Sequence, residues 1–144
     1  MTRLRADLVH QAIDMAELER AVSHPSCGAV LLFSGNVRDH HGGRRVVRLC
    51  YSAYEPMARQ RLLSIVEELE AGGRDARLRL AIVHRLGDVP IGEPSVVIAV
   101  ASAHREAAYE ANRTALERLK REVPIWKRET YEDGEEVWRE EEAL

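Results

Sequence analysis

Two uninterrupted apolar runs limit what this chain can fold into. They lie at Gly28 to Asn36 (GAVLLFSGN) and at Ser95 to Ser102 (SVVIAVAS). A continuous apolar run of this length, bounded by polar or glycine-containing segments, is typical of a buried strand. The longest wholly apolar stretch, Val96 to Ala101, is far shorter than a membrane span. The chain is therefore expected to pack around a buried sheet.

Further strands and helices are predicted around these two runs. Three more strands are predicted. Arg3 to Val9 alternates weakly, Val46 to Tyr54 is rich in β-branched and aromatic residues, and Ala76 to His84 alternates at first and then becomes apolar. Caps, apolar stripes and stop signals predict three helices, at Met15 to Val22, from Pro56 to the Gly72-Gly73 pair, and from about Ala103 to Val123. In the second helix Leu62, Leu63, Val66 and Leu69 are expected to form one buried face.

The C-terminal segment is predicted to be a hairpin. IWKRETY and EEVWRE flank the turn signal Glu132-Asp133-Gly134-Glu135. Strands and helices alternate along the chain, but the hairpin makes the sheet at least partly antiparallel, so the predicted class is α/β or α+β. With 144 residues and no internal repeat, residues 1–144 are expected to form a single domain.

The composition excludes several classes of protein. Hydrophobic residues make up 45% and charged residues 31% of the chain, which is typical of a soluble globular protein. A net charge of −3 does not favour general nucleic-acid binding, so any basic site must be local. MTRLRADLVH does not resemble a secretory signal, which favours a cytoplasmic location. Cys27 and Cys50 form no CxxC pair and are expected to be buried, unpaired thiols.

The junction Ser102-Ala103-His104-Arg105 joins a predicted strand to the long helix. Ser102 is predicted to cap that helix by accepting a hydrogen bond from a free backbone N–H, which would place His104 and Arg105 in the first turn. A cation there lies at the unfavourable end of the helix dipole. Two interpretations stay open: a structural or solvated segment, or an anion site for phosphate or carboxylate.

Two lysines form a second candidate site. Lys120 follows Leu119, which belongs to the predicted buried stripe of the long helix, so Lys120 lies about 100° away at the edge of that stripe. Lys127 lies past Pro124 in the hairpin, on the face shared with Ile125 and Glu129. Judged by spacing alone, both could equally be ordinary surface lysines, and truncating either is expected to remove no core volume.

The loop from Asn36 to Gly43 is a third candidate, because sites are often built on loops that follow buried strands. Arg38 is a candidate contact for an anion. His40 and His41 are adjacent, so their side chains should diverge, which makes them poor joint metal ligands. The glycines match neither GxGxxG nor the P-loop, and no Ser-His-Asp or Cys-His arrangement is visible.

Four blocks of sequence resemble the large, catalytic subunit of molybdopterin synthase. They are FSGNVRDH at 33–40, AIVHRLG at 81–87, ASAHREAAYEA at 101–111 and PIWKRE at 124–129, and their order and spacing also match that family. The resemblance covers roughly Gly28 to Glu129. The combination of the SAHR block, a helix bearing a lysine and the Pro-x-Trp-Lys-Arg-Glu block makes it specific.

The resemblance implies an α/β hammerhead with an added small antiparallel β subdomain. It also implies a central homodimer that binds a small ubiquitin-like sulfur-carrier subunit at each end, giving a heterotetramer. The carrier's C-terminal Gly-Gly thiocarboxylate would enter the active site and deliver two sulfurs to cyclic pyranopterin monophosphate. The product would be the molybdopterin dithiolene of the molybdenum cofactor. No metal and no other cofactor is expected at this site.

Carried over residue by residue, the resemblance assigns catalysis to Lys120 and Lys127, anion binding to Arg38, His104 and Arg105, and an apolar pocket position to Phe33. Because the family's pocket is completed across the dimer, His104 and Arg105 are expected to serve the partner protomer's lysines. The tail departs from relatives that place an arginine four residues after the tail tryptophan. Here Glu142 stands there, and Arg139 is the candidate substitute.

The residue types suit this chemistry. Two anions, a phosphate and a thiocarboxylate, would have to be held together, which needs several cations. A lysine among them could transfer a proton or act as a nucleophile. The hypothesis is that Lys120 transfers a proton or transiently captures the acyl group, and that Lys127 orients the pterin and its phosphate. Two rivals are a carrier-independent phosphoester- or nucleotide-processing enzyme and a non-catalytic binding module.

Overall fold

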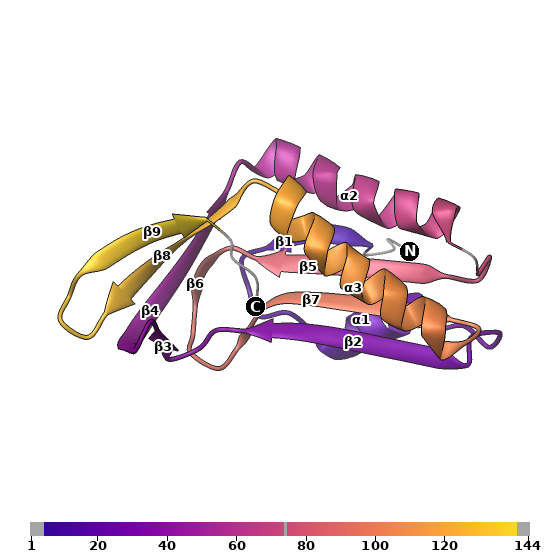
Figure 1. The fold of residues 1–144 in the computed structure, drawn as a ribbon, viewed down its shortest axis with the longest axis horizontal. Helices are drawn as coiled ribbons and strands as arrows, with labels where there is room; N and C mark the ends of the chain where they lie inside the picture. The colour runs from indigo at the N-terminus through magenta and orange to yellow at the C-terminus, as the bar shows by residue number, and fades with distance from the viewer. Residues whose placement is uncertain (1–4, 74, 141–144) are drawn as a thin grey trace.

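Two sheets form the framework of the protein. The computed structural model describes residues 5–73 and 75–140. The first sheet has the strand order β1-β5-β7-β2, with β1 parallel to β5 and the other neighbours antiparallel (Figure 1). Its strands are β1 (Ala6–Val9), β5 (Arg79–Arg85), β7 (Pro94–Ser102) and β2 (Ala29–Asn36).

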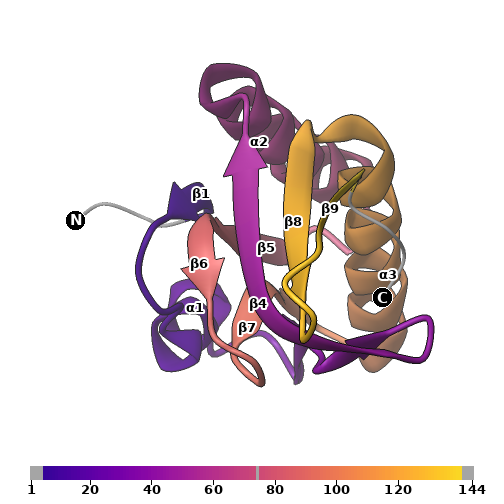
Figure 2. The same ribbon diagram turned by 90° about the vertical axis from the view of Figure 1, so that its left-hand side faces the viewer.

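The second sheet is antiparallel and lies across one end of the first (Figure 2). It has the order β3-β4-β8-β9, with β6 paired to β4. Its strands are β3 (His40–His41), β4 (Arg44–Ala53), β8 (Ile125–Tyr131), β9 (Glu136–Glu140) and β6 (Gly87–Val89). The predicted hairpin is thus confirmed as β8 and β9, whose Trp126 to Thr130 pair with Glu140 to Glu136.

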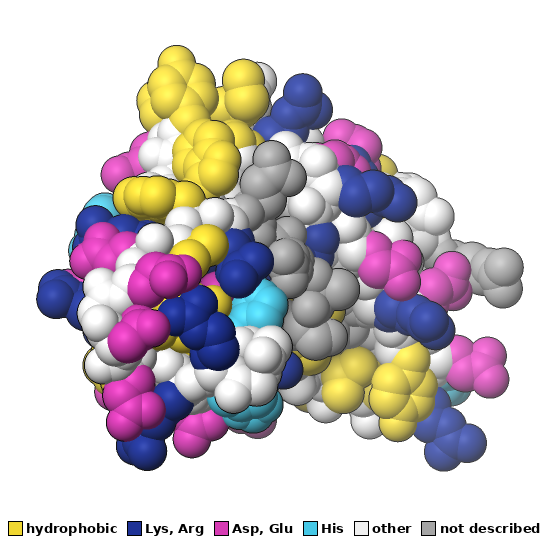
Figure 3. All heavy atoms as spheres, turned by 60° about the vertical axis from the view of Figure 1, so that its left-hand side comes forward, with side chains coloured by type: hydrophobic (Ala, Val, Ile, Leu, Met, Phe, Trp, Pro, Cys, Tyr) yellow, Lys and Arg dark blue, Asp and Glu magenta, His cyan; other side chains and the backbone are white. Residues whose placement is uncertain are grey.

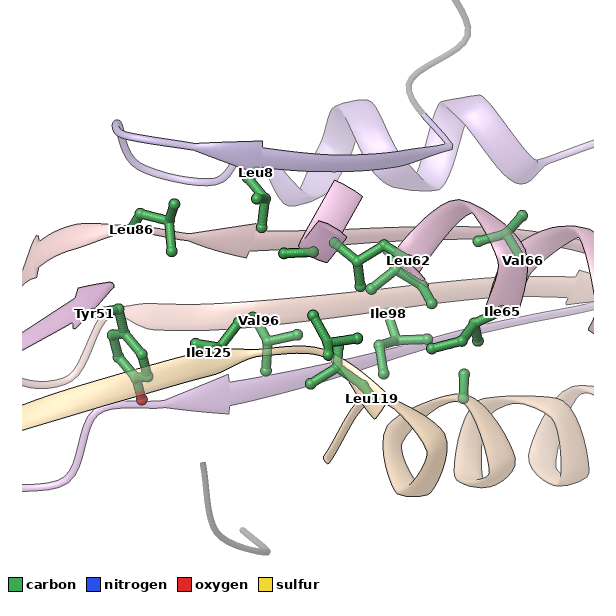
Figure 4. Packing of buried hydrophobic residues seen from close by; sticks show 14 of the residues in the cluster. Leu8, Tyr51, Leu62, Ile65, Val66, Leu86, Val96, Ile98, Leu119 and Ile125 are labelled. Atoms are coloured by element: carbon green, nitrogen blue, oxygen red, sulfur yellow. The ribbon is translucent and has the colours of Figure 1, made fainter. Parts of the chain in front are cut away.

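Three helices cover the two faces of the first sheet. α2 (Glu55–Gly72) and α3 (Arg105–Glu122) pack on one face and α1 (Met15–Val22) on the other. Successive side chains of β7 point to opposite faces of the sheet. Ile98 therefore belongs to the larger core under α2 and α3, whereas Val97 and Ala99 belong to the smaller core under α1. In Figure 4 the labelled side chains of α2 and α3 lie against those of β7.

The two apolar runs are confirmed as strands β2 and β7, and β7 is buried along nearly its whole length. The polar, glycine- and proline-containing segment GDVPIGEP after Leu86 is predicted to be a loop, but its first three residues, Gly87–Val89, pair with β4 as β6. The predicted face of the second helix is also wrong at one position. Leu62 is fully buried while Leu63, 100° further round, is 44% exposed. Both cysteines are free and half-buried, and no described helix is long and apolar enough to cross a membrane.

Leu62 and Leu63 provide a matched test of this packing. Leu62→Ala should lower the free energy of unfolding by about 2–5 kcal/mol, since it removes buried methyl groups and leaves a cavity. Leu63→Ala should change it by no more than about 0.5 kcal/mol, because the side chain is already partly in solvent. Urea unfolding of both variants measures the difference. Equal losses would show that α2 does not pack in the orientation described.

Candidate active site

The two lysines lie close to the place where the two sheets meet. Lys120 is in the last turn of α3 and is half-buried, and Lys127 lies in the middle of β8. The side chain of Lys127 is on the buried face of β8 with those of Ile125 and Glu129, as predicted. Its exposed fraction is only 8%, so the expectation that Lys127 occupies a surface position is wrong.

Arg38 lies just beyond the end of β2, and Phe33 lies in the middle of that strand, opposite Ile98 of β7. β7 runs antiparallel to β2, and α3 packs on both strands while it runs back from the Ser102 end of β7 toward the opposite end of the sheet (Figure 1). Phe33 is half-buried and packs against the larger core, and Arg38 is exposed just beyond β2. The last turn of α3, which carries Lys120, and the loop that carries Arg38 therefore lie toward the same end of the first sheet, and Phe33 lies between the two ends.

A buried carboxylate ties the loop that carries Arg38 to the strand that carries Lys127. Glu129 is 3% exposed, and its Oε2 lies 2.9 Å from Nδ1 of His41 in β3. The Tyr131 hydroxyl donates to Oε1 of Glu129 at 3.0 Å, and Nε of Arg139 donates to the same oxygen. Three elements, β3, β8 and β9, thus converge on one carboxylate next to Lys127.

Glu129 is held in its charged form. Burial disfavours the carboxylate and would raise its pKa, but hydrogen bonds from His41, Arg139 and Tyr131 and the charge of Lys127 act in the opposite direction. The net result is a pKa below the ordinary value of 4.5. The inner face of the second sheet therefore carries a fixed negative charge among its cations.

His104 and Arg105 lie at the opposite end of α3 from Lys120. His104 is the N-cap residue and Arg105 the first residue of this 18-residue helix, and both are exposed. At 1.5 Å per residue, the helix separates His104 from Lys120 by about 24 Å along its axis. Within one chain, the structure does not bring these two groups of cations together.

The predicted capping at the start of α3 is wrong. The N-cap is His104, and the Ser102 hydroxyl instead donates to the His104 carbonyl oxygen at 2.5 Å. The N–H of Ala103 donates to Oδ2 of Asp75 at 2.6 Å. The backbone at this junction therefore binds a carboxylate of the same chain.

Comparison with known proteins shows the family of this chain. The family model described as MoaE protein matches residues 8–122. This chain belongs to the MoaE protein family. A molybdopterin synthase catalytic subunit from Bacillus subtilis (strain 168) is 48% identical over 132 residues, covering 92% of this chain and 83% of that protein.

Two solved structures share the fold of this MoaE-family chain. The molybdopterin synthase structure from Staphylococcus aureus has a TM-score of 0.87 and 37% identity, and covers 96% of this chain and 98% of that one. The complex of subunits 1 and 2 of molybdopterin-converting factor from Helicobacter pylori 26695 shows the same fold at a TM-score of 0.75 and 24% identity, covering 95% of this chain and 91% of that one. The predicted fold class is confirmed.

Sequence reasoning missed most of the network around Glu129. It placed Glu129 on the face of Lys127 but gave the carboxylate no role, and it considered His41 only as a metal ligand. The divergence of His40 and His41 is confirmed, because His40 contacts Asp39 whereas His41 contacts Glu129. A charged residue on the buried face of an alternating strand was the available signal.

Arg139 occupies the position expected of a cation beside Lys127. It is the cross-strand neighbour of Lys127, and its guanidinium binds Glu129 and the Tyr131 hydroxyl, the latter at 3.3 Å. Glu142, four residues after Trp138, lies outside the described residues. Among the described residues, no group of three or more His, Cys, Asp or Glu side chains is placed to hold a metal ion.

The buried carboxylate predicts a specific acid sensitivity. Because the pKa of Glu129 is lower in the folded protein, its contribution to stability is complete above about pH 4.5 and is lost as the pH falls through the lowered value. Glu129→Gln should cost about 1–3 kcal/mol at pH 7, since the buried donors lose a charged acceptor. The variant should also lose less of its remaining stability between pH 5 and pH 3, roughly the range in which carboxylates titrate.

Urea unfolding at several pH values measures both effects. Glu132→Gln, which changes an exposed carboxyl of the same hairpin, is the matched control and should follow the wild type. Parallel acid profiles for the wild type and Glu129→Gln would contradict the assignment of Glu129 as a buried anion.

Proposed function

We propose that this chain is the catalytic subunit of a molybdopterin synthase. In this reaction sulfur passes from the C-terminal thiocarboxylate of a small carrier subunit to cyclic pyranopterin monophosphate, forming the dithiolene. The observation that carries the proposal is the pair Lys120 and Lys127 at the meeting point of the two sheets, in a chain that belongs to the MoaE family. Phe33 on β2 and Arg38 just beyond the end of β2 complete the part of the site that one chain supplies.

The use of lysine supports chemistry beyond charge neutralisation. Lys120 and Lys127 are the only lysines among 21 lysine and arginine residues, so the chain uses arginine at every other such position. Arginine binds anions well but cannot give up its proton near neutral pH, whereas lysine can act as an acid, base or nucleophile. Lys120 transfers a proton or captures the acyl group, and Lys127, fixed on β8, orients the substrate.

A second copy of the chain supplies the cations that one copy lacks. β2 is an edge strand, and no described strand pairs with its outer side. Its sequence, AVLLFSGN, contains no charge and no proline, so nothing in it prevents pairing with another strand. A two-fold axis at the middle of β2 would join two copies into one continuous sheet.

This pairing would deliver His104 and Arg105 to the partner's lysines. Ala29 at the start of β2 is opposite Ser102, so the 102–105 turn lies at that end of the strand. Antiparallel self-pairing sets this end beside the Asn36 end of the other copy, where Arg38 follows. Ala29 and Asn36 are about 24 Å apart at 3.4 Å per residue. That distance matches the spacing between the two ends of α3.

An exposed apolar patch supports a protein partner at the end of the molecule formed by the second sheet. Tyr54, Met57, Trp126 and Trp138 are 41–58% exposed. Tyr54 is the N-cap of α2 and Met57 lies in its first turn, whereas Trp126 lies on β8 and Trp138 on β9. Figure 3 shows hydrophobic side chains gathered in the upper part of this face. Patches of this kind mark protein interaction sites. The molybdopterin-converting factor of Helicobacter pylori, which shares the fold, is itself a complex of two subunits.

The lysines give the direct test of the proposed chemistry. Combined with a thiocarboxylated carrier and cyclic pyranopterin monophosphate, the wild type should form dithiolene product. Lys120→Ala should nearly abolish the product and Lys127→Ala should reduce it strongly. Lys120→Ala should change stability by no more than about 0.5 kcal/mol. Lys127→Ala should cost about 1–3 kcal/mol, because it removes a buried cation beside Glu129.

Lys120→Arg distinguishes a role of Lys120 in binding an anion from a role in transferring a proton. Retained activity would mean that Lys120 only holds an anion, whereas a loss as severe as in Lys120→Ala would mean that it transfers a proton or attacks the acyl group. Arg121→Ala changes the neighbouring exposed cation of α3 and should leave turnover unchanged. Wild-type turnover in both alanine variants, or turnover of a phosphoester without any carrier, would contradict the proposal.

The edge strand gives a test of the assembly. Light scattering should return twice the mass of one chain. Val30→Lys adds a charge to a 42% exposed position on β2 and should shift the protein toward monomers with loss of turnover. Val47→Lys, at a 48% exposed position on β4, is the matched control for dimer formation. A dimer unaffected by Val30→Lys would place the interface elsewhere.

A further inference from the structure

The turn that precedes α3 is fixed through its backbone. The Ser102 hydroxyl donates to the His104 carbonyl at 2.5 Å, and the N–H of Gly28 donates to the Ala103 carbonyl at 3.2 Å. The N–H of Ala103 donates to Oδ2 of Asp75 at 2.6 Å. Two other segments, at Gly28 and Asp75, together with Ser102 itself, therefore hold the backbone of Ala103 and His104.

Gly28 and Ser102 hold the turn from the side of the first sheet. A Cβ atom on Gly28 would lie 2.8 Å from the Ala103 carbonyl oxygen, a distance that side chains do not tolerate, so the close approach requires glycine. Ser102 is fully buried at the end of β7. These contacts come from the strands, and their loss would also disturb the sheet.

Asp75 holds the turn from the other side, in the connection between α2 and β5. Its Oδ1 accepts the N–H of Arg77 at 2.9 Å, so the carboxylate is fixed within its own loop while Oδ2 reaches Ala103. Hydrogen bonds from the backbone of Arg77, Ala103 and His104 lower the pKa of Asp75 below its ordinary value. The group is therefore an anion throughout the neutral range and binds the turn through charge-assisted hydrogen bonds.

The backbone of this turn is held by hydrogen bonds, whereas the side chains of His104 and Arg105 extend into solvent. His104 and Arg105 are exposed, and the His104 side chain makes no capping hydrogen bond. Among the described residues, neither side chain makes a hydrogen bond or an ion pair. A rigid backbone that projects two uncommitted cationic or titratable side chains is the arrangement expected of groups that bind something outside their own chain.

We propose that Asp75 is a positioning residue, which fixes His104 and Arg105 of one copy in the place required by Lys120 and Lys127 of a second copy. The inference rests on the proposed function and deepens it by naming the residue that aligns the shared site. Asp75 touches neither lysine nor substrate, and it acts only through the backbone of Ala103 and His104. A displacement of about 1 Å in a positioning element can cost a hundredfold in rate.

Single variants test the effect on turnover. Asp75→Ala should lower kcat/KM at least about tenfold by releasing the turn. Asp75→Asn keeps one oxygen that can accept from Ala103 and should retain most of the activity. Asp14→Ala is the matched control, because Asp14 also caps a backbone N–H, that of Glu17 at 3.1 Å, but at α1 on the opposite face. Asp75→Ala and Asp14→Ala should lower the melting temperature to a similar extent, and only Asp75→Ala should lose turnover.

Mixed dimers separate positioning in trans from general damage. Lys120→Ala and Asp75→Ala proteins, unfolded together and refolded at equal amounts, should regain about a quarter of wild-type turnover, because half of the dimers then carry one intact site. Lys120→Ala with His104→Ala should behave in the same way. Asp75→Ala with His104→Ala should show no recovery, since both changes affect the same contribution.

The results distinguish a failure of the role of Asp75 from a failure of the site shared between two copies. Recovery with His104→Ala but not with Asp75→Ala would overturn the role of Asp75 and leave the shared site intact. No recovery in either mixture with Lys120→Ala would overturn the shared site and the inference with it. Wild-type turnover in Asp75→Ala alone would also overturn the inference.

Discussion

The 18-residue helix α3 separates the two groups of side chains that the proposed function assigns to one site. His104 and Arg105 are at its first turn and Lys120 is in its last, and a helix of this length cannot fold back to join them. The rest of the arrangement depends on this spacing. β2 lies beneath the helix, has nearly the same length, and exposes its outer edge. Pairing of two copies through this edge about a two-fold axis would place the first turn of α3 in one copy beside the last turn of α3 in the other.

A second constraint concerns charge. A site that binds two anions needs cations. The most buried charged group beside Lys127, however, is the carboxylate of Glu129. That carboxylate fixes the side chains of His41 and Arg139, and its contact with His41 ties β3, two residues beyond Arg38, to β8. A buried anion of this kind keeps flexible cationic side chains in defined positions. The chain has lysine at only two positions and arginine at every other such position, and the proposed function places proton transfer or nucleophilic attack at those two lysines.

Much of this could be predicted from local sequence, for identifiable reasons. The apolar runs of β2 and β7 and the turn between β8 and β9 are local signals, and strand alternation placed Lys127 on the correct face of β8. The burial of Lys127 could not be predicted, because it depends on the second sheet packing against the end of the first. The role of Asp75 was hidden for the same reason. Its partner Ala103 is 28 residues away, and only the folded chain brings the carboxylate to the start of α3. Ser102 was misassigned because a serine before a helix is a common cap, and its tertiary contact overrode that preference.

The measurement closest to the central claim is a crosslink between the two ends of α3 in different chains. Cys27→Ser and Cys50→Ser remove the free thiols, and His104→Cys with Lys120→Cys then place one thiol at each end of the helix. A bifunctional thiol reagent much shorter than the helix cannot join the two positions within one chain. If the site is shared, the reagent should produce covalent dimers, with position 104 of one chain linked to position 120 of the other. A protein that is dimeric in solution but yields only singly modified, uncrosslinked chains would contradict the shared site.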